Sequence, residues 1–258
     1  MAEIAIRNIS KTFTDRSRDR DVVAIDNVSM TIADHDFVCL LGPSGCGKST
    51  LLNMIAGFEQ PSAGRIEVGG VPVEKPGADR GVVFQQPTLM PWLTVADNVA
   101  FHLKLKGLGK AERRERAQRF IDLVGLTGFE GHFPSELSGG MNQRVGIARA
   151  LLMNPRVILM DEPFAALDAQ TKLEMQEELV QIWQRIACTI VFVTHSVDEA
   201  LVLGNRIAVM TRRPGRIRED FEFDMPRPRD ITSPAFNDAK RRVLGLIREE
   251  ATLVRRAA

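Results

Sequence analysis

Apolar positions in this chain form short continuous runs that alternate with longer segments of helical period. Continuous runs such as residues 37–41 and 157–160 are typical of strands buried on both faces. The pattern predicts strands over residues 3–9, 22–32, 36–41, 64–68, 71–73, 81–84, 156–160, 189–194 and 207–210. It predicts helices over residues 51–57, 94–106, 110–124, 142–153, 169–187, 197–203 and 235–253. Strands that alternate with helices indicate an α/β fold with a mainly parallel sheet.

Three stretches depart from this alternation. The strands before residue 74 follow one another without long helices, and Gly69-Gly70 predicts a tight hairpin turn, so we expect an N-terminal antiparallel β-subdomain. Residues 14–21 are charged and predict a solvated loop. Residues 87–154 are rich in helix and indicate an inserted α-helical subdomain. Prolines and arginines at 226–229 interrupt the pattern, so residues 231–258 are expected to form a C-terminal helical extension after a domain spanning 1–230.

Composition excludes several classes of protein. Lys and Arg number 34 against 33 Asp and Glu, a net charge of +1 that offers no global field for a nucleic acid. Cys39, Cys46 and Cys188 lack C-x-x-C spacing and are expected to be reduced thiols in a cytosolic protein. No signal peptide is apparent, and no apolar run approaches a membrane span. Any membrane role is therefore expected to come through a partner.

A glycine-rich loop lies between the apolar run at 37–41 and the helical pattern at 51–57. Its glycines let several backbone N–H groups converge on one phosphate, at the positive end of the following helix. Lys48 is expected to reach the β- and γ-phosphates, and the Ser49 hydroxyl to bind Mg²⁺. An accidental glycine loop is the alternative, but the flanking strand and helix favour a nucleoside triphosphate site. The site comprises Gly42, Pro43, Ser44, Gly45, Cys46, Gly47, Lys48, Ser49 and Thr50.

Two adjacent carboxylates follow the apolar run at 157–160. Neighbouring side chains of a strand point to opposite faces, so Asp161 and Glu162 are expected to have different roles. Asp161 would hold Mg²⁺ through water, and Glu162 would act as general base or position the attacking water. The alternative is a pair of acids at a sheet edge, and the phosphate loop favours the functional interpretation.

A second phosphate site is predicted where the helix after residue 137 begins. Ser138 would start this helix, and Gly139 and Gly140 leave its first turn without side chains. Taken alone, Ser-Gly-Gly is equally compatible with an ordinary helix cap. Its place shortly before the strand that carries Asp161 favours a role in nucleotide binding.

Over nearly its whole length the chain resembles the ATPase subunits of ATP-binding cassette (ABC) transporters. Residues 42–50 match that family's phosphate loop, 137–143 its signature and 157–162 its catalytic strand. Gln85 matches the glutamine loop, Ala166-Leu167-Asp168 the loop after the catalytic strand, and His195 the switch histidine. Met141-Asn142 departs from the commoner Gln-Arg, while the serine and both glycines of the signature are intact.

The resemblance implies a P-loop NTPase core of RecA type in which two subunits pack head-to-tail around ATP. The signature residues would bind the nucleotide held by the other subunit, and Asp168 would contact that subunit. His195 would bind the γ-phosphate, and Gln85 would contact Mg²⁺ and the attacking water. A structural histidine, an ordinary loop glutamine and a helix N-cap at Asp168 are the alternatives. The signature residues expected to act in this way are Ser138, Gly139, Gly140 and Gln143.

The adenine of ATP usually stacks on an aromatic residue near the first strand in this family. The chain has no tyrosine, and Phe13 is the candidate by position. A core position for Phe13 is the alternative.

Residues 86–105, 211–217 and 225–230 resemble the nitrate, sulfonate and taurine importer branch. The resemblance implies an ATPase at the cytoplasmic face of the inner membrane, paired with a second ATPase subunit, most simply a copy of itself. It would work with permease subunits and indirectly with a periplasmic or extracellular solute-binding protein, to import a small anion. Residues 89–93 would contribute to a groove for a permease helix, with core packing as the alternative.

Two other classes of function stay open. A soluble ABC-type ATPase acting on ribosomes or DNA usually carries two cassettes or basic arms, and this chain has one signature and no basic excess. A P-loop kinase or GTPase would explain residues 42–50 but leave residues 137–143 and His195 without a role. ATP-dependent dimerisation of a Glu162→Gln variant would exclude a monomeric kinase.

Overall fold

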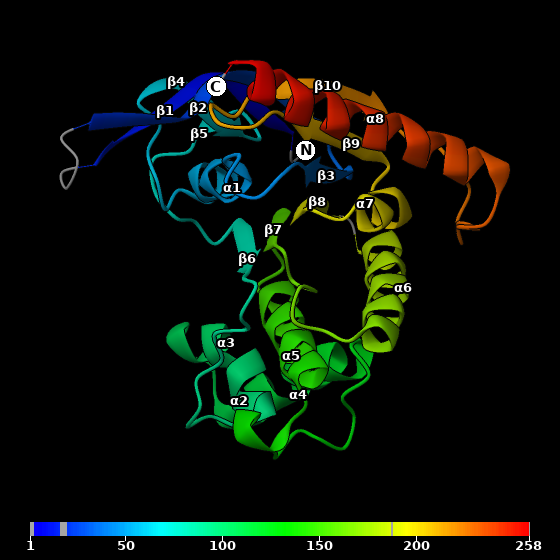
Figure 1. Cartoon of the computed structure of the whole chain (residues 1–258). Coiled ribbons are helices and arrows are strands. Elements are labelled where there is room, and N and C mark those ends of the chain that lie inside the picture. Colours follow the sequence, from blue (N-terminus) through cyan, green and yellow to red (C-terminus); the bar gives the residue numbers. More distant parts are fainter. Residues whose placement is uncertain (1–2, 16–19, 187, 258) are drawn as a thin grey trace. The chain divides into compact units, whose positions relative to one another are not determined.

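The computed structural model describes residues 3–15, 20–186 and 188–257 (Figure 1). The chain divides into two compact units, each with its own core. Residues 1–77 and 189–258 form the first unit, and residues 78–188 form the second. Among the described residues, no helix is both long enough and apolar enough to cross a membrane.

An antiparallel sheet forms one layer of the first unit. Its strands are β1 (Ile4–Asp15), β2 (Arg20–Ile32), β4 (Ala63–Val68) and β5 (Val71–Pro72), in the order β2-β1-β4-β5. Gly69 and Gly70 form the β4–β5 turn with positive φ angles of 58° and 78°, as the sequence predicts. The predicted loop over 14–21 is shorter than expected, and residues 16–19 lie outside the described part. Thr14 of β1 pairs with Asp21 of β2. Backbone hydrogen bonds between strands need no apolar side chains, so charged residues are compatible with this pairing.

A second sheet of the first unit supports the phosphate loop. Its described strands run in the order β10 (Ile217–Glu222), β9 (Arg206–Met210), β3 (Phe37–Leu41) and β8 (Thr189–Thr194). Strand β3 is parallel to both of its neighbours, and every side chain of β3 and β8 is buried, which explains their continuous apolar runs. The sequence did not predict β10, because its charged residues show no apolar alternation. It pairs antiparallel with β9, where Arg206 and Asp220 form an ion pair.

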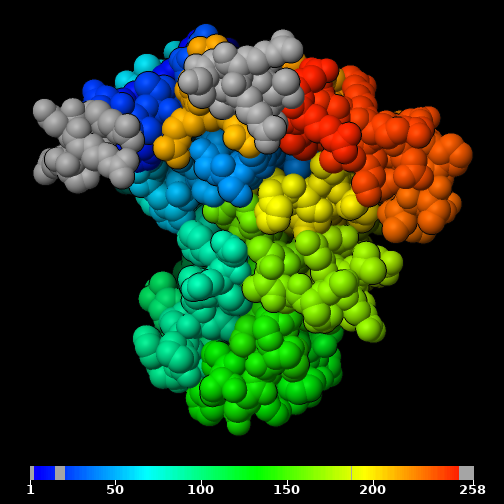
Figure 2. Space-filling view, in the orientation of Figure 1, coloured from blue at the N-terminus to red at the C-terminus, as the bar shows by residue number. Residues whose placement is uncertain are grey.

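Three helices complete the first unit: α1 (Lys48–Ala56), α7 (Val197–Leu203) and α8 (Pro234–Ala257). Helix α1 contacts β8, and α7 contacts β3 and β8. Helix α8 contacts α7 and β9 and buries Phe236 and Val243. Its orange and red side chains form an outer layer beside the yellow residues of α7 (Figure 2).

Two arginines hold the end of α7. Arg227 donates to the carbonyl oxygens of Val202 and Leu203, at 3.1 and 2.5 Å. Arg229 donates to those of Leu201 and Gly204, at 2.7 and 2.5 Å. These are carbonyl groups that the end of a helix leaves without intrahelical donors. Burial lowers the pKa of Arg229 to about 10. The interruption at 226–229 that the sequence predicts therefore has a structural role.

The second unit pairs two parallel strands with a group of helices. The strands are β6 (Arg80–Val83) and β7 (Val157–Asp161). The helices are α2 (Val95–Val99), α3 (Phe101–Leu105), α4 (Lys110–Leu123), α5 (Gly139–Leu152) and α6 (Ala169–Arg185), with a 3₁₀ turn at Pro134–Glu136. The prediction of one helix over 94–106 was wrong, because Ala100 has ψ of 2° and separates α2 from α3.

All three cysteines are free and buried, in agreement with the expected reduced thiols. Burial raises the pKa of Cys188 to about 11 and that of Cys39 further still. These thiols are therefore protonated at neutral pH, and they serve as small apolar core residues.

Candidate nucleotide-binding site

The phosphate loop connects the buried strand β3 to helix α1, as the sequence predicts. Gly45 and Gly47 have φ angles of 75° and 102°, in the left-handed region that favours glycine. A Cβ on Gly47 would lie 2.5 Å from Cδ1 of Ile25 and 3.0 Å from the carbonyl oxygen of Ala24. Both the backbone angle and the space therefore require glycine at this position.

Lys48 lies inside the curve of this loop and is 5% exposed. Its Nζ donates to the carbonyl oxygens of Gly42 at 2.7 Å and Pro43 at 3.1 Å. Gly47, the N-cap of α1, has no side chain that could bind the N–H groups of the first turn. These donors, the helix dipole and the ammonium group together fit a polyphosphate.

His195 leaves the sheet beside the phosphate loop. Leu41, the last residue of β3, is the register partner of Thr194, the last residue of β8. Because the two strands are parallel, Gly42 and His195 follow them at the same edge of the sheet. His195 is exposed. The first unit therefore presents an imidazole and a phosphate loop on neighbouring strands.

A matching arrangement occurs in the second unit. Val83 of β6 and Met160 of β7 are register partners on parallel strands. The segment with Gln85 and the segment with Asp161 and Glu162 therefore leave this strand pair at one edge. Gln85 is exposed, and both carboxylic residues are half-buried.

Glu162 has an unusual backbone conformation. Its φ is 43°, a left-handed value that is uncommon for a residue other than glycine. Pro163 follows it, and the residue before a proline normally favours extended conformations. A strained backbone of this kind costs about 1–3 kcal/mol and is found most often at functional sites.

The start of α5 is capped and closely packed. The Ser138 hydroxyl accepts a hydrogen bond from the N–H of Met141 at 3.2 Å, so Ser138 is the helix N-cap that the sequence predicts. Gly139 is exposed, and a Cβ there would have open space around it. A Cβ on Gly140 would lie 2.7 Å from Cγ2 of Thr171. Gly140 therefore permits α5 to approach α6 closely.

Gln143 lies in the same helix but is directed into its own unit. The residue is buried, and its Nε2 donates to the carbonyl oxygen of Phe84 at 3.2 Å. Gln143 thus connects the signature helix to the residue that precedes Gln85. Sequence reasoning missed this link, because two residues 59 positions apart show no local signal.

Asp168 is the N-cap of α6, the alternative that the sequence left open. Its carboxylate accepts hydrogen bonds from the N–H groups of Gln170 and Thr171, at 3.1 and 3.0 Å. The Thr171 hydroxyl donates to the same carboxylate at 2.6 Å. Hydrogen bonds from the side chain and then the backbone of Thr171 lower the pKa of Asp168.

Phe13 is not a core residue. It lies on β1 and is 41% exposed, so the core alternative is wrong. The ammonium group of Lys11 is 4.9 Å from the centre of its ring. An exposed ring in the same unit as the phosphate loop fits a base-stacking role.

Residues 89–93 form a loop that Asn98 organises. Asn98 is fully buried, accepts from the N–H of Met90 and donates to the carbonyl oxygens of Met90 and Leu93. In the sequence, Asn98 could be recognised as a polar residue on the otherwise apolar face of α2. Trp92 is 72% exposed, so core packing does not account for it.

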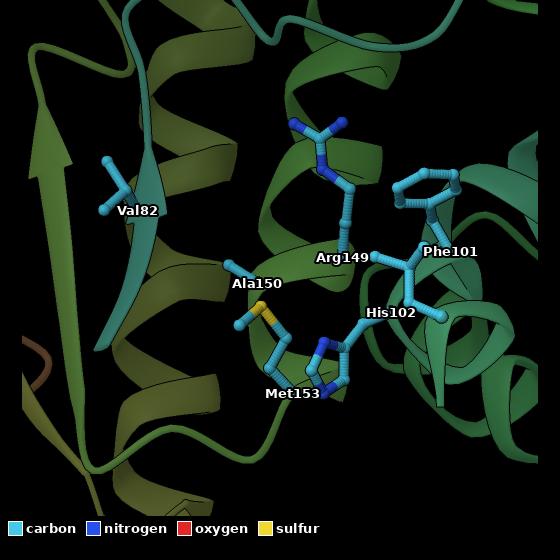
Figure 3. A pocket seen from close by; sticks show the side chains of 7 residues that line it. Val82, Phe101, His102, Arg149, Ala150 and Met153 are labelled. Carbon is cyan, nitrogen blue, oxygen red and sulfur yellow. The ribbon is translucent and has the colours of Figure 1, made fainter. Parts of the chain in front are cut away.

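A hollow of about 220 Å³ lies near this loop in the second unit. We call it the α3–α5 hollow. Figure 3 shows the side chains of His102 and Met153 next to each other, while Arg149 extends away from them. Arg149 donates to the carbonyl oxygens of Pro87 and Thr88, at 2.9 and 3.0 Å, and so joins the hollow to the segment before Leu89. The hollow is lined by Val82, Phe101, His102, Leu105, Arg149, Ala150 and Met153.

The fold and the phosphate loop define a P-loop nucleoside triphosphatase, and comparisons with known proteins agree. Residues 25–165 match the family model described as ABC transporter. The taurine import ATP-binding protein TauB of Rhizobium johnstonii is 57% identical over 81% of this chain and 79% of its own length. The nitrate import ATP-binding protein NrtD of Synechocystis sp. is 52% identical over 80% of this chain and 77% of its own length.

A solved dimeric ATP-binding cassette, in a post-hydrolysis state with ADP and Pi, superposes with a TM-score of 0.76. The two sequences are 33% identical, and the match covers 86% of this chain and 100% of the solved chain. The chain belongs to the ABC transporter family. It is an ATP-binding ATPase subunit with the P-loop NTPase fold, and the predicted α/β class is confirmed.

Proposed function

We propose that this chain hydrolyses ATP to power the import of a small anion through a separate membrane permease. The main support for this proposal is the sequence identity of the chain, 57% and 52%, with relatives named for taurine import and nitrate import. The solute would be a taurine-like, sulfonate-like or nitrate-like anion. Residues 1–230 would form the ATPase domain, with the helical subdomain at 87–154, and residues 231–258 a C-terminal extension.

In the first unit, Lys48 would exchange the carbonyl oxygens of Gly42 and Pro43 for the β- and γ-phosphates. The Ser49 hydroxyl would bind Mg²⁺, a hard cation that prefers oxygen ligands. Phe13 would stack on the adenine. His195 would donate a hydrogen bond to the γ-phosphate. Support comes from the buried Lys48, the uncapped α1 and the shared register position of Leu41 and Thr194.

In the second unit, Asp161 would hold Mg²⁺ through water. Glu162 would accept the proton of the water that attacks the γ-phosphorus, and Gln85 would contact Mg²⁺ and orient that water. Bound ATP supplies the phosphoanhydride bond that is broken, so the protein mainly positions groups and stabilises charge. The register of β6 with β7 and the strained backbone at Glu162 support these roles.

Two copies would bind two ATP molecules between them. Ser138, Gly139 and Gly140 would offer the N-terminus of α5 to the γ-phosphate held by the other copy. Asp168 would contact that copy as well as capping α6. Gln143, which is buried, would act from within the second unit through its bond to Phe84. The dimeric arrangement of the solved cassette supports this pairing.

The α3–α5 hollow, together with the exposed Trp92, would receive a helix of the permease. Leu105 is exposed at this hollow, and the Nε2 atom of His102 is buried without a hydrogen-bond partner. Burial and then Lys106 lower the pKa of His102, so its imidazole is neutral at pH 7. An amphipathic helix that inserts an apolar side chain and a hydrogen-bonding group would satisfy both features. This contact would hold the protein at the cytoplasmic face of the inner membrane, near a solute-binding protein on the other side.

The test is affinity capture from gently solubilised membranes of the native host, with partners identified by mass spectrometry. We expect a multi-span permease, encoded with a solute-binding protein, to be retained. Leu105→Glu should abolish retention of the permease while basal ATP hydrolysis persists. Val71→Glu, at a similarly exposed position on β5, is the matched control and should retain it. Ribosomal or DNA-bound partners without a membrane protein would contradict the importer and favour a soluble ABC-type machine.

A further inference from the structure

The residues on both sides of His195 are joined by a closed ring of hydrogen bonds. The N–H of Ser196 donates to the Thr194 hydroxyl at 2.9 Å. The Thr194 hydroxyl donates to the carboxylate of Glu199. The N–H of Glu199 donates to the Ser196 hydroxyl at 3.3 Å, which makes Ser196 the N-cap of α7. His195 therefore lies between two residues, Thr194 and Ser196, that the ring joins to each other.

Two residues of this ring are buried, Ser196 is half-buried, and His195 is exposed. Thr194 is 1% exposed and Glu199 is 5% exposed. Both therefore lie where a polar group without a partner would be costly. Thr194 is also fixed from the other side, as the register partner of Leu41 directly before the phosphate loop.

We propose that Thr194 and Glu199 are positioning residues that hold His195 in its hydrolysis-competent position. This inference rests on the proposed role of His195 at the γ-phosphate. The Thr194 hydroxyl binds the backbone just after His195 and, through Glu199, the first turn of α7. It thereby fixes the direction in which the chain leaves the sheet at His195.

The expected consequence is a loss of turnover without a loss of ATP affinity. Lys48 and the α1 N-terminus would bind phosphate through groups that do not belong to the ring. A catalytic group misplaced by about 1 Å can cost about 10²-fold in rate. Thr194→Val keeps the shape of the side chain but removes the hydroxyl, so it breaks two bonds of the ring. Thr194→Ser keeps the hydroxyl and should restore most of the turnover.

The test compares the ATP turnover number, the Kd for ATP and hydrogen exchange of the Ser196 amide in these variants. Thr194→Val should lower kcat by about 10- to 100-fold, leave Kd within about 2-fold and accelerate exchange at Ser196. Thr189→Val is the matched control. Thr189 is fully buried at the other end of β8, where its hydroxyl accepts from the N–H of His35 at 3.0 Å. Thr189→Val should change stability but leave kcat and Ser196 exchange unchanged.

A double-mutant cycle separates positioning from a merely structural role. In a His195→Ala background, Thr194→Val should lower the residual kcat by less than about 2-fold, because there is no imidazole left to position. An equal loss with and without His195 would overturn the proposal, as would a normal kcat in Thr194→Val. A normal kcat in His195→Ala would instead overturn the role of His195 itself, and the positioning with it. Glu199→Ala should reproduce Thr194→Val, and Glu199→Gln, which keeps an acceptor oxygen, should be milder.

Discussion

The side-chain amide of Gln143 donates a hydrogen bond to the carbonyl oxygen of Phe84 across 3.2 Å, inside the second unit. Gln143 belongs to α5, the helix that begins at Ser138, and Phe84 immediately precedes Gln85. This partly buried hydrogen bond therefore connects the first turns of α5 with the glutamine segment. A displacement of either segment would be transmitted to the other.

Replacing Gln143 with leucine should destabilise the protein. Leucine has a similar size but removes the hydrogen bond to the Phe84 carbonyl oxygen, at a cost of about 0.5–1.5 kcal/mol. The free energy of unfolding in urea measures this cost. Gln181→Leu, at an exposed position of α6, should change it by less than about 0.5 kcal/mol. Equal values for the two variants would show that the Gln143 bond contributes nothing.

Alanine should be tolerated at Gly139 and not at Gly140, although the two glycines are adjacent. A Cβ on Gly139 meets nothing within 4 Å, whereas a Cβ on Gly140 lies 2.7 Å from Cγ2 of Thr171. Overpacking of this kind costs about 1–3 kcal/mol. Thermal unfolding should show a lower Tm for Gly140→Ala and a nearly unchanged Tm for Gly139→Ala. Similar Tm values in both would mean that α6 moves away at little cost.

The Glu162→Gln variant should bind ATP normally and turn it over about 10²- to 10⁴-fold more slowly, the range for loss of a positioned base. Glutamine keeps the size of the side chain but cannot accept the proton of water. Trapped nucleotide should then favour the dimer, which size-exclusion chromatography with ATP would detect. Glu177→Gln, on the exposed side of α6, is the control. Wild-type hydrolysis by Glu162→Gln would refute its assignment as the base.

Phe13→Ala should weaken ATP binding and leave stability nearly unchanged. Loss of a base–aromatic stack costs about 1–3 kcal/mol, equivalent to about 5- to 150-fold in Kd. Because Phe13 is exposed, its removal leaves no core cavity. Titration with a fluorescent ATP analogue gives the Kd, and Phe58→Ala, another exposed phenylalanine of the first unit, is the comparison. An unchanged Kd in Phe13→Ala would mean that the adenine stacks elsewhere.

Asp168 should make stability depend on acidity. Hydrogen bonds from Thr171 lower its pKa in the folded state below its usual value of 3.8. A carboxyl group with a lowered pKa stabilises the fold above its unfolded pKa and loses that contribution as the pH falls through the folded one. Asp168→Asn caps the helix without titrating. Its Tm should therefore fall less than that of the wild type between pH 5 and about pH 3. Parallel curves would exclude this linkage.

The fold class could be predicted from the sequence, and so could the functional groups whose residues are neighbours in the chain. The apolar runs of β3, β7 and β8 are continuous because both of their faces are buried. The phosphate loop, the two acids and the Ser138 cap each consist of neighbours in the chain. Strand β10 could not be predicted in this way, because its pairing with β9 depends on residues brought together only by folding. The division between α2 and α3 follows from the ψ of 2° at Ala100, which helical period does not predict.

The groups proposed to bind and hydrolyse ATP can be identified from the sequence itself, because a phosphate loop or a pair of acids is a local pattern of chain conformation and charge. Tertiary structure decided how these groups are supported. It showed that Gln143 donates to the carbonyl oxygen of Phe84, that Phe13 is exposed and that Thr194 and Glu199, near His195, are buried. These facts depend on burial and on contacts between distant residues. Burial and long-range contacts are determined by how helices and strands pack together, so they cannot be predicted from a short stretch of sequence.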